Sequence, residues 1–329
     1  MLKKIYFILP FLLTAFLVNS QVVINEYSAS NFDSHLDNYG EYEDWVELYN
    51  TTNSDIDLNG WSLTDKPANL TKWSFTGSFI VSANSVAIVY CSGRDELVGG
   101  VAHTNFKITQ TKAGEVFVLS DASGNIIDSA RAIPAQKSHS RGRDVNGGSS
   151  WSVFTTATPN TSNTGAMLEY APLPIFSQSS GYYSAPFDLT LSCADPNAIL
   201  YYTTDGSMPD NSANLYTGPF NISSTSVVKA VAYSTNGLVP PSFIDYHTFF
   251  INDTHTVPIL SVSGDSVAVL IEDGLQNIGS WWNGTPHEPQ GTIEWFDKNG
   301  VLIDKGTGEF NKHGNDSWAY DQRGFDYVM

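Results

Sequence analysis

Oxygen-bearing side chains stand at calcium-loop spacing in the stretch SDIDLNGWSLTD. Asp55, Asp57 and Asn59 occupy the first, third and fifth places of an EF-hand loop, and Gly60 occupies the sixth. The twelfth place is Lys66, where such a loop needs a bidentate Glu. The flanks alternate apolar and polar residues, which is typical of strands and not of helices. The sequence therefore predicts a turn between two strands at Asn59 and Gly60.

A second acidic group is a candidate metal site. Glu26 lies in the first strand pattern, and Asp44 and Glu47 lie at the next one. Adjacent strands of a sandwich are about 5 Å apart, so the three carboxylates can converge. Carboxylates that close repel one another unless hydrogen bonds or Ca²⁺ intervene. We expect either a calcium site at Glu26, Asp44 and Glu47 or ordinary hydrogen-bonded acids, and no cofactor that the chain requires.

Catalytic motifs are not found in the sequence. Seven histidines are scattered along it: His35, His103, His139, His247, His255, His287 and His313. They form neither HExxH nor a pair at helical ligand spacing, and there is no Cys-x-x-Cys, which argues against zinc chemistry. Cys91 and Cys193 lie in separate strand patterns and are predicted to be free thiols. We predict no catalytic residue.

Charge and the N-terminus indicate an exported protein. The chain has 34 Asp and Glu against 16 Lys and Arg, a net charge of −18. Such an acidic surface repels phosphate backbones, so we expect no nucleic-acid partner. Residues 1–20 combine two lysines, a short apolar run and small residues, as a signal peptide does. We expect a secreted or cell-surface protein with no stable membrane span after cleavage.

Alternating strand patterns, separated by turns rich in Gly, Asn, Asp and Ser, predict an all-β chain. Two immunoglobulin-like β-sandwiches in tandem and a partial β-rich C-terminal segment are expected. The predicted boundaries are a signal peptide at 1–20, a first sandwich at 21–158, a linker at 159–172, a second sandwich at 173–251 and the final segment at 252–329.

The motifs of residues 21–158 occur in the order VVINEYSASN, EDWVELYN, IDLNGWSLTD, AGEVFVLSDASGNIIDSA and SRGRDVNGGSSW, followed by ATPNTSN. At these residues the chain resembles the bacterial lamin-tail domain family. The resemblance implies a compact immunoglobulin-like β-sandwich. Large side chains that we expect to face inward from opposing strands agree with that fold: Trp45, Val46, Leu48 and Tyr49, with Trp61 and Leu63.

Residues 173–251 contain AILYYTTDGSMPD, LYTGPFNIS, STSVVKAVAYSTNGLVPPS and DYHTFFI. They resemble the C-terminal β-sandwich module of chitobiase and related hexosaminidases. In those relatives the module accompanies a catalytic domain without supplying catalytic residues. Within it, Val228, Ala230 and Ala232 alternate with Lys229 and Val231, which predicts a strand buried on one face only.

Residues 252–329 end in a stretch that resembles the opening of the CotH-kinase-like family. Gly314-Asn315-Asp316-Ser317 would match its Gly-x-x-Ser element, and Gln322 and Arg323 stand where the family usually has two lysines. Arg323 is thus the one candidate for nucleotide contact. The acidic metal-binding residues of that family lie further downstream, so we expect a truncated start of such a domain.

These patterns favour a non-catalytic, exported protein made of binding or spacer modules. One alternative is the N-terminal fragment of a secreted CotH-like protein kinase. Another is a carbohydrate-binding adhesin, because Trp281 and Trp282 could stack on sugar rings. Expected partners are a cell-surface polysaccharide or a protein.

Overall fold

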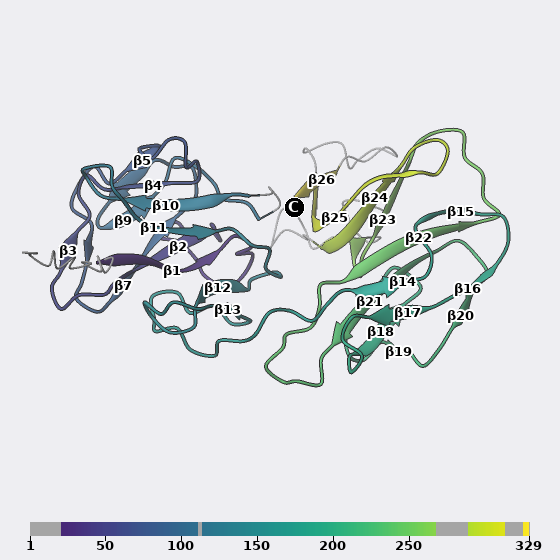
Figure 1. Cartoon of the computed structure of the whole chain (residues 1–329). Helices are drawn as coiled ribbons and strands as arrows, with labels where there is room; N and C mark the ends of the chain where they lie inside the picture. Colours follow the sequence, from purple (N-terminus) through teal and green to yellow (C-terminus); the bar gives the residue numbers. More distant parts are fainter. Residues whose placement is uncertain (1–20, 111–113, 268–288, 313–324, 329) are drawn as a thin grey trace, which may run out of the picture. The chain divides into compact units, whose positions relative to one another are not determined.

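The computed structural model describes residues 21–110, 114–267, 289–312 and 325–328. The regular elements in these residues are strands, arranged in several sheets (Figure 1). None of the described residues belongs to a helix with the length and apolar character that crossing a membrane requires. The chain divides into two compact units. The first comprises Met1–Trp151 and Thr156–Thr164, and the second comprises Ser152–Thr155 and Gly165–Met329.

The strands up to Phe154 form three sheets. They are β1 (Val22–Ser28), β2 (Trp45–Asn50), β3 (Ile56–Asp57), β4 (Ser62–Thr64), β5 (Trp73–Ser74), β6 (Ile80–Val81), β7 (Val86–Tyr90), β8 (Glu96–Val98), β9 (Val101–His103), β10 (Val116–Ser120), β11 (Ile126–Arg131), β12 (Ser140–Arg143) and β13 (Trp151–Phe154). The largest sheet has the order β13-β12-β1-β2-β7-β9-β8, the second β11-β10-β4-β5, and the third pairs β3 with β6. β7 and β9 run parallel, unlike the antiparallel pairs around them.

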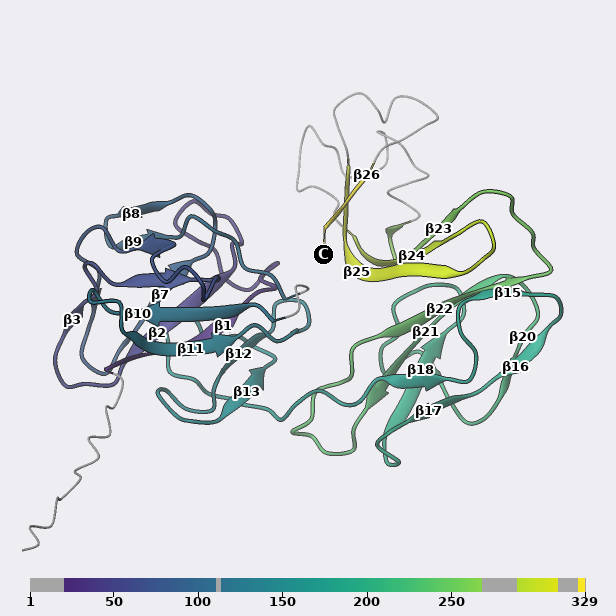
Figure 2. The same cartoon turned by 45° about the horizontal axis from the view of Figure 1, so that its top comes forward.

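The two larger sheets pack face to face and enclose the main core of the first unit (Figure 2). Val46 and Leu48 on β2 point into this core, as alternation predicts. Phe117 and Leu119 on β10 meet them from the second sheet. The prediction that Trp45 faces inward is wrong. Because successive strand residues point to opposite faces, Trp45 faces away from Val46 and joins a small cluster with Ile88 and Tyr90 on the outer face of the large sheet. Cys91 is buried, Cys193 is half-buried, and both are free thiols as predicted.

A β-bulge in β1 changes which side chains reach the core. The pairing with β2 is in step to Ile24, shifts before Glu26 and then continues to Ser28. Ile24 and Tyr27 both enter the core as a result, although three positions separate them. Glu26 is left opposite Glu47 in the register with β2. Simple alternation does not predict this arrangement.

The turn predicted at Asn59 and Gly60 is confirmed. The N–H of Trp61 donates to the carbonyl of Leu58 at 2.8 Å, and Gly60 has a φ of +82°, which favours glycine. The turn does not close a hairpin, because β3 pairs with β6 whereas β4 pairs with β5 and β10. It carries the chain from one sheet to another.

Thirteen further strands lie among the described residues of the second unit. They are β14 (Pro174–Phe176), β15 (Gly181–Tyr183), β16 (Phe187–Leu189), β17 (Leu191–Cys193), β18 (Ile199–Thr203), β19 (Asn214–Leu215), β20 (Phe220–Ile222), β21 (Ser226–Tyr233), β22 (Asp245–Ile251), β23 (Ile259–Ser263), β24 (Gln290–Phe296), β25 (Leu302–Lys312) and β26 (Phe325–Val328). One sheet has the order β15-β22-β21-β18-β19, two pairs join β14 with β17 and β16 with β20, and β23-β24-β25-β26 form what we call the C-terminal sheet.

β21 is buried on both faces, so the prediction that only one face would be buried is wrong. Val228 and Ala230 face the sandwich core, as expected. On the other face Lys229 is fully buried and Val231 is 3 % exposed. The Lys229 ammonium donates to the carbonyl of Ser263 at 3.2 Å, at the end of β23. The C-terminal sheet therefore covers the face that the sequence pattern assigned to solvent.

Polar contacts hold the C-terminal sheet against the second sandwich. Glu294 on β24 is 1 % exposed and accepts hydrogen bonds from Ser180 Oγ, at 2.5 Å, and from Thr248 Oγ1. Lys305 on β25 forms a 2.7 Å ion pair with Asp245. The boundary expected at 251 thus falls inside one compact unit, which includes the sheet beyond it.

Candidate functional site

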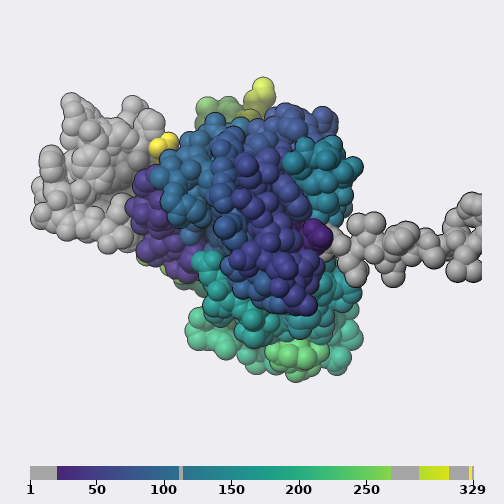
Figure 3. All heavy atoms as spheres, turned by 90° about the vertical axis from the view of Figure 1, so that its left-hand side faces the viewer, coloured from purple at the N-terminus to yellow at the C-terminus, as the bar shows by residue number. Residues whose placement is uncertain are grey.

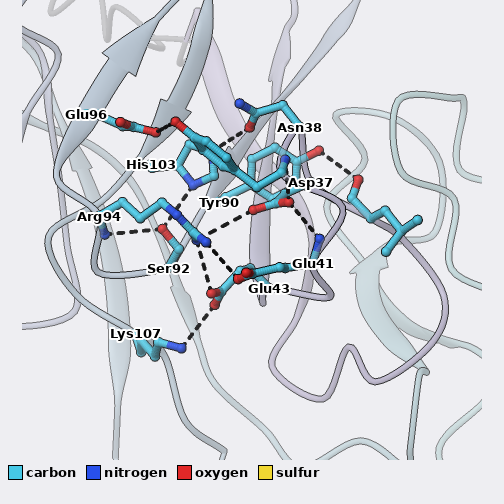
Figure 4. A network of polar contacts seen from close by, with 12 residues as sticks. Asp37, Asn38, Glu41, Glu43, Tyr90, Ser92, Arg94, Glu96, His103 and Lys107 are labelled. Carbon is cyan, nitrogen blue, oxygen red and sulfur yellow. Dashed lines mark hydrogen bonds and ion pairs between the residues drawn. The ribbon is translucent and has the colours of Figure 1, made fainter. Parts of the chain in front are cut away.

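The candidate site is loop 31–44, the segment between β1 and β2 of the first unit, together with the strand residues that it contacts (Figure 4). Asn31, at its start, is buried and fixes the path of the loop. Its amide oxygen accepts hydrogen bonds from the N–H groups of Ser34 and His35, at 3.3 and 3.1 Å. Its amide nitrogen donates to the carbonyls of His35 and Glu43, at 2.7 and 2.9 Å. One side chain therefore joins both ends of the loop.

Asp37 closes the tip of the loop. Its Oδ1 accepts hydrogen bonds from the N–H groups of Tyr39 and Glu41, at 2.8 and 2.9 Å. The Asp37 N–H donates to the carbonyl of Glu41 at 2.8 Å, and Gly40 has a φ of +80°. The Asp37 side chain is shielded from solvent, and its Oδ2 lies 3.6 Å from Arg94 Nη1. A short polar sequence thereby forms a fixed turn.

Arg94, which precedes β8, forms ion pairs with carboxylates of the loop. Its Nη2 lies 2.7 Å from Glu41 and its Nη1 lies 3.2 Å from Glu43. The guanidinium also lies over the ring of Tyr39, 4.6 Å from the centroid. The hydrogen bond that Arg94 donates to Glu41 raises the pKa of Arg94 above its ordinary value. Lys107 adds a 3.2 Å ion pair to Glu43.

His103, at the end of β9, is fully buried beneath the loop. Its Nδ1 lies 2.9 Å from Ser92 Oγ and its Nε2 lies 2.7 Å from Asn38 Oδ1. Because an amide oxygen only accepts, Nε2 carries the hydrogen and Nδ1 accepts the Ser92 hydroxyl. Tyr90 stacks on the imidazole at 5.0 Å, and Tyr39 meets it edge-on at 5.6 Å. Burial lowers the pKa of His103, which favours the neutral ring.

The line Ser92, His103, Asn38 has the order of a nucleophile, a base and an orienting group. These groups are closed to a substrate, because Ser92 is only 6 % exposed and His103 is fully buried. The N–H of Arg94 also donates to Ser92 Oγ at 3.2 Å. The coloured atoms on the face of the first unit that Figure 3 turns to the viewer form no deep hollow. We conclude that this line of groups holds the loop in place.

The predicted carboxylates fall into two places. Glu26 is buried beside Glu47 on the outer face of the large sheet, where the register of β1 and β2 pairs them. Glu26 Oε1 accepts from Ser140 Oγ at 2.5 Å and from the N–H of Thr158 at 2.9 Å, and Oε2 accepts from Thr158 Oγ1. Burial raises the pKa of Glu26. Its oxygens hold the segment that follows β13.

Glu47 serves the same segment. Its Oε1 accepts from Asn25 Nδ2 at 2.9 Å, and its Oε2 accepts from the N–H of Asn160 at 2.7 Å. Asn25 Nδ2 also donates to Asn163 Oδ1 at 3.0 Å. Burial raises the pKa of Glu47 to about 8, against the opposing effect of the Asn25 hydrogen bond. The motifs NEY, WVELYN and TPNTSN are thus joined by buried hydrogen bonds.

Asp44 does not join this pair. Its Oδ1 accepts from the N–H of Asn31 at 3.1 Å, at the base of loop 31–44, and burial raises its pKa to about 7. In the part of the chain that the structure describes, no group of three or more His, Cys, Asp or Glu side chains could hold a metal ion. A calcium site at Glu26, Asp44 and Glu47 stays a prediction.

Other predicted features lie outside the described residues. These are the signal peptide at 1–20, the aromatic pair Trp281 and Trp282, and Arg323 with the Gly314–Ser317 element. Nucleotide contact by Arg323 and sugar stacking by the tryptophans therefore stay predictions.

A hollow of about 420 Å³ lies in the second unit, between β22 and β23. Its walls are rich in hydroxyl groups, but several of these are already paired. Thr248 Oγ1 contacts Ser261 Oγ at 2.8 Å, and Thr225 Oγ1 accepts from the N–H of Ile251 at 3.1 Å. Asp205 caps its own turn by accepting from the N–H of Ser207 at 3.0 Å. The hollow therefore has fewer polar groups to offer a ligand than its lining suggests.

The strands and packed sheets of the described residues place the chain among all-β proteins with immunoglobulin-like domains. Comparison with known families agrees: residues 18–133 match the Lamin Tail Domain, and residues 178–243 match the chitobiase/beta-hexosaminidase C-terminal domain. Both resemblances expected from the sequence are thereby confirmed over these ranges. The matches stop at residue 243, so the resemblance of the final segment to CotH kinases stays a prediction. No curated protein matches the chain.

Sequence reasoning missed the central members of the candidate site. His103 was one of seven scattered histidines, and Ser92, Arg94 and Asn38 belonged to no motif. The available signal was loop 31–44 itself, where Asn31 and Asp37 can form turns beside exposed aromatic residues. Strand pairing, which sequence periodicity does not specify, brings the other residues to it.

Proposed function

We propose that the chain is an exported, non-catalytic binding protein of the cell surface. The first unit carries the binding surface on loop 31–44, and the second unit serves as a spacer. The lamin-tail and chitobiase C-terminal matches fit this assignment, because both are immunoglobulin-like sandwiches of the kind that serve as binding or spacer modules.

The structure of loop 31–44 carries the proposal. Asn31 and Asp37 bond the backbone of the loop itself, Arg94 pairs with Glu41, and Ser92 and His103 are buried beneath the loop. Leu36, Tyr39 and Tyr42 are exposed on this fixed backbone, together with acidic side chains such as Asp33 and Glu41. Rigid loops at the end of a sandwich are a common way to present a binding surface.

Export rests on the signal-like residues 1–20 and on the acidic composition. Secretion can be measured by fusing residues 1–20 to a reporter enzyme that folds only outside the cytoplasm. We expect reporter activity with the native segment and none when Leu12 and Leu13 are replaced by Asp. Equal activity from both fusions would refute export by this segment.

A binding experiment tests the proposal as a whole. The labelled chain from Gln21 onward is incubated with intact cells of the source organism, untreated, protease-treated or periodate-treated. We expect saturable retention on untreated cells and on only one of the two treated samples. Loss after protease treatment indicates a protein partner, and loss after periodate treatment indicates a polysaccharide partner. Absence of saturable retention on untreated cells would contradict the proposed function.

The kinase-fragment alternative makes a different prediction. A chain with that activity would transfer phosphate from ATP and Mg²⁺ to itself or to a surface protein. We expect no phosphate transfer by the chain from Gln21 onward. Transfer that is lost when Arg323 is changed to Ala would favour the kinase alternative.

A further inference from the structure

Three large side chains are exposed within seven residues of loop 31–44. Leu36, Tyr39 and Tyr42 are 47, 52 and 46 % exposed. The hydrogen bond from Asp37 N to Glu41 O closes the tip between them, so Leu36 and Tyr42 flank the same turn. Single exposed apolar residues are ordinary on protein surfaces, but three on one short loop form a local patch. We call Leu36, Tyr39 and Tyr42 the loop patch.

The backbone that carries the loop patch is fixed before any partner arrives. Tyr90 Oη donates to the carbonyl of Leu36 at 3.4 Å, and Tyr39 Oη donates to Glu96 Oε1 at 2.6 Å. With the Asn31 and Asp37 hydrogen bonds, these contacts hold the loop along its whole length. A fixed loop loses little conformational entropy on binding, and tyrosine adds large contact area with few rotatable bonds.

The charge around the patch is negative. Loop 31–44 contains five acidic residues and no Lys or Arg. Asp33 and Glu41 have side chains that are 60 and 58 % exposed, although each forms an ion pair, with Lys137 at 3.3 Å and with Arg94 at 2.7 Å. Among the described residues, the ion pairs of the loop's five acids involve three cations, Arg94, Lys107 and Lys137. The border of the patch is therefore complementary to a cationic surface.

Tyr39 already binds a guanidinium within the chain. Arg94 lies over its ring at 4.6 Å while pairing with Glu41 and Glu43. Tyrosine and carboxylate together are suitable for arginine and lysine side chains. A sugar ring needs a broad free aromatic face, whereas one face of Tyr39 is taken and its hydroxyl is bonded to Glu96. The aliphatic Leu36 also suits a protein surface better than a sugar.

We propose that the loop patch binds a protein partner whose contact surface combines apolar residues with Arg or Lys. This rests on the proposed function and adds the chemistry of the partner. Leu36 and the two tyrosines contact the apolar part of that surface, and Asp33 and Glu41 face its cations. Association is therefore faster and tighter at low ionic strength.

The test uses a phage-displayed library of random dodecapeptides selected on the chain from Gln21 onward. A loop variant replaces Leu36, Tyr39 and Tyr42 with Ser, which leaves the net charge unchanged. A matched variant replaces Ile80 and Ile126 with Ser, both exposed in the same unit outside the loop, at 56 and 60 %. Circular dichroism and melting temperature establish that both variants are folded. A glycan array is probed with the same three proteins.

We expect selected peptides that carry a net positive charge together with aromatic or aliphatic residues. Their affinity should fall about tenfold or more in the loop variant, because truncating the large side chains at the centre of an interface removes much of its binding free energy. It should stay unchanged in the Ile80 and Ile126 variant and weaken as salt is raised. Because both variants keep the charge of the native chain, nonspecific attraction of cationic peptides is recognised by equal binding to all three.

Three results of the peptide selection would overturn the inference: no enriched peptide, enriched peptides that are neutral or acidic, or enriched peptides that bind the loop variant as well as the native chain. On the glycan array, binding that the loop variant loses would also overturn it. Each of these leaves the cell-retention experiment intact as a separate test. If the chain is retained on cells but selects no cationic peptides, the inference alone is wrong. If the chain is not retained on cells, the proposed function is wrong.

Discussion

At the residue scale, burial shifts the pKa values of the polar groups enclosed in the first unit. His103 lies between an amide oxygen and a hydroxyl, and burial lowers its pKa. Glu26 and Glu47 are buried side by side, and burial raises the pKa of each. Both sets of groups are shielded from solvent and bonded to neighbouring residues, and they join loops to the sheet.

Replacing Asn38 with Asp should raise the pKa of His103. The new carboxylate would stand at Nε2, now 2.7 Å from the amide oxygen, and would favour the imidazolium by about 1–2 pKa units. The titration of the His103 ring protons by NMR measures this. Asp95→Asn, an exposed change nearby, is the control and should leave the pKa in place. An unchanged pKa in Asn38→Asp would mean that residue 38 does not contact Nε2.

The stability of the first unit should decline with rising pH through the titration of Glu47. Its ordinary pKa is 4.5, and burial raises it to about 8 in the folded state. Between these values the folded state holds more protons than the unfolded state, so the free energy of unfolding decreases as pH rises from about 4.5 to about 8.

Glu47→Gln cannot lose a proton, and its decline over the same range should be shallower than that of the native chain. Denaturant titrations at several pH values compare the two slopes. Glu26 and Asp44 also have raised pKa values, so a smaller decline remains in the variant. Parallel slopes would show that Glu47 is ionised throughout.

At the element scale, periodicity predicted the strands but not their partners. Val46 and Leu48 were correctly placed in the core, whereas Trp45, which was placed there too, packs on the outer face of the sheet. The bulge that sets Glu26 opposite Glu47 depends on one extra residue, which alternation does not reveal. Lys229 was assigned to solvent because its own strand pattern contains no sign of the sheet that covers it. The local sequence pattern is enough to predict a strand. Which residues come together in a site depends on the pairing of strands that are distant in the sequence.

Asn31→Ala should release loop 31–44. The substitution removes hydrogen bonds to both ends of the loop and leaves backbone groups unpaired, which costs about 1–3 kcal/mol in the free energy of unfolding. Amide hydrogen exchange should quicken across 33–43 while β1 and β2 keep their protection. Asn105→Ala, which removes a single exposed contact to the Lys72 carbonyl, is the control. Equal exchange in both variants would contradict the role given to Asn31.

Glu294→Ala should weaken the attachment of the C-terminal sheet. It removes the acceptor for Ser180 and Thr248 and should destabilise the second unit by roughly 2–4 kcal/mol. Glu294→Gln keeps the size and one acceptor oxygen and should cost less. Limited proteolysis after residue 251, with denaturant unfolding of both variants, gives the comparison. If Ala costs no more than Gln, the sheet is held by its apolar contacts instead.

At the scale of the whole molecule, an acidic chain of two compact units is suited to binding a partner on its exposed surface and not in a pocket. The net charge of −18 attracts cationic surfaces over a distance that salt shortens. The family matches cover residues 18–133 and 178–243, and the fold class could be predicted from the strand patterns and motifs of the chain. The position of the proposed binding surface could not be predicted, because it depends on groups that β7, β8 and β9 bring beneath one loop.

The most direct test of loop 31–44 as the binding surface is hydrogen–deuterium exchange of the chain from Gln21 onward, alone and saturated with the tightest selected peptide. We predict slower exchange in residues 31–44 and in β8, with the second unit unchanged. Protection that appears instead around the hollow between β22 and β23, with none in the loop, would contradict the account.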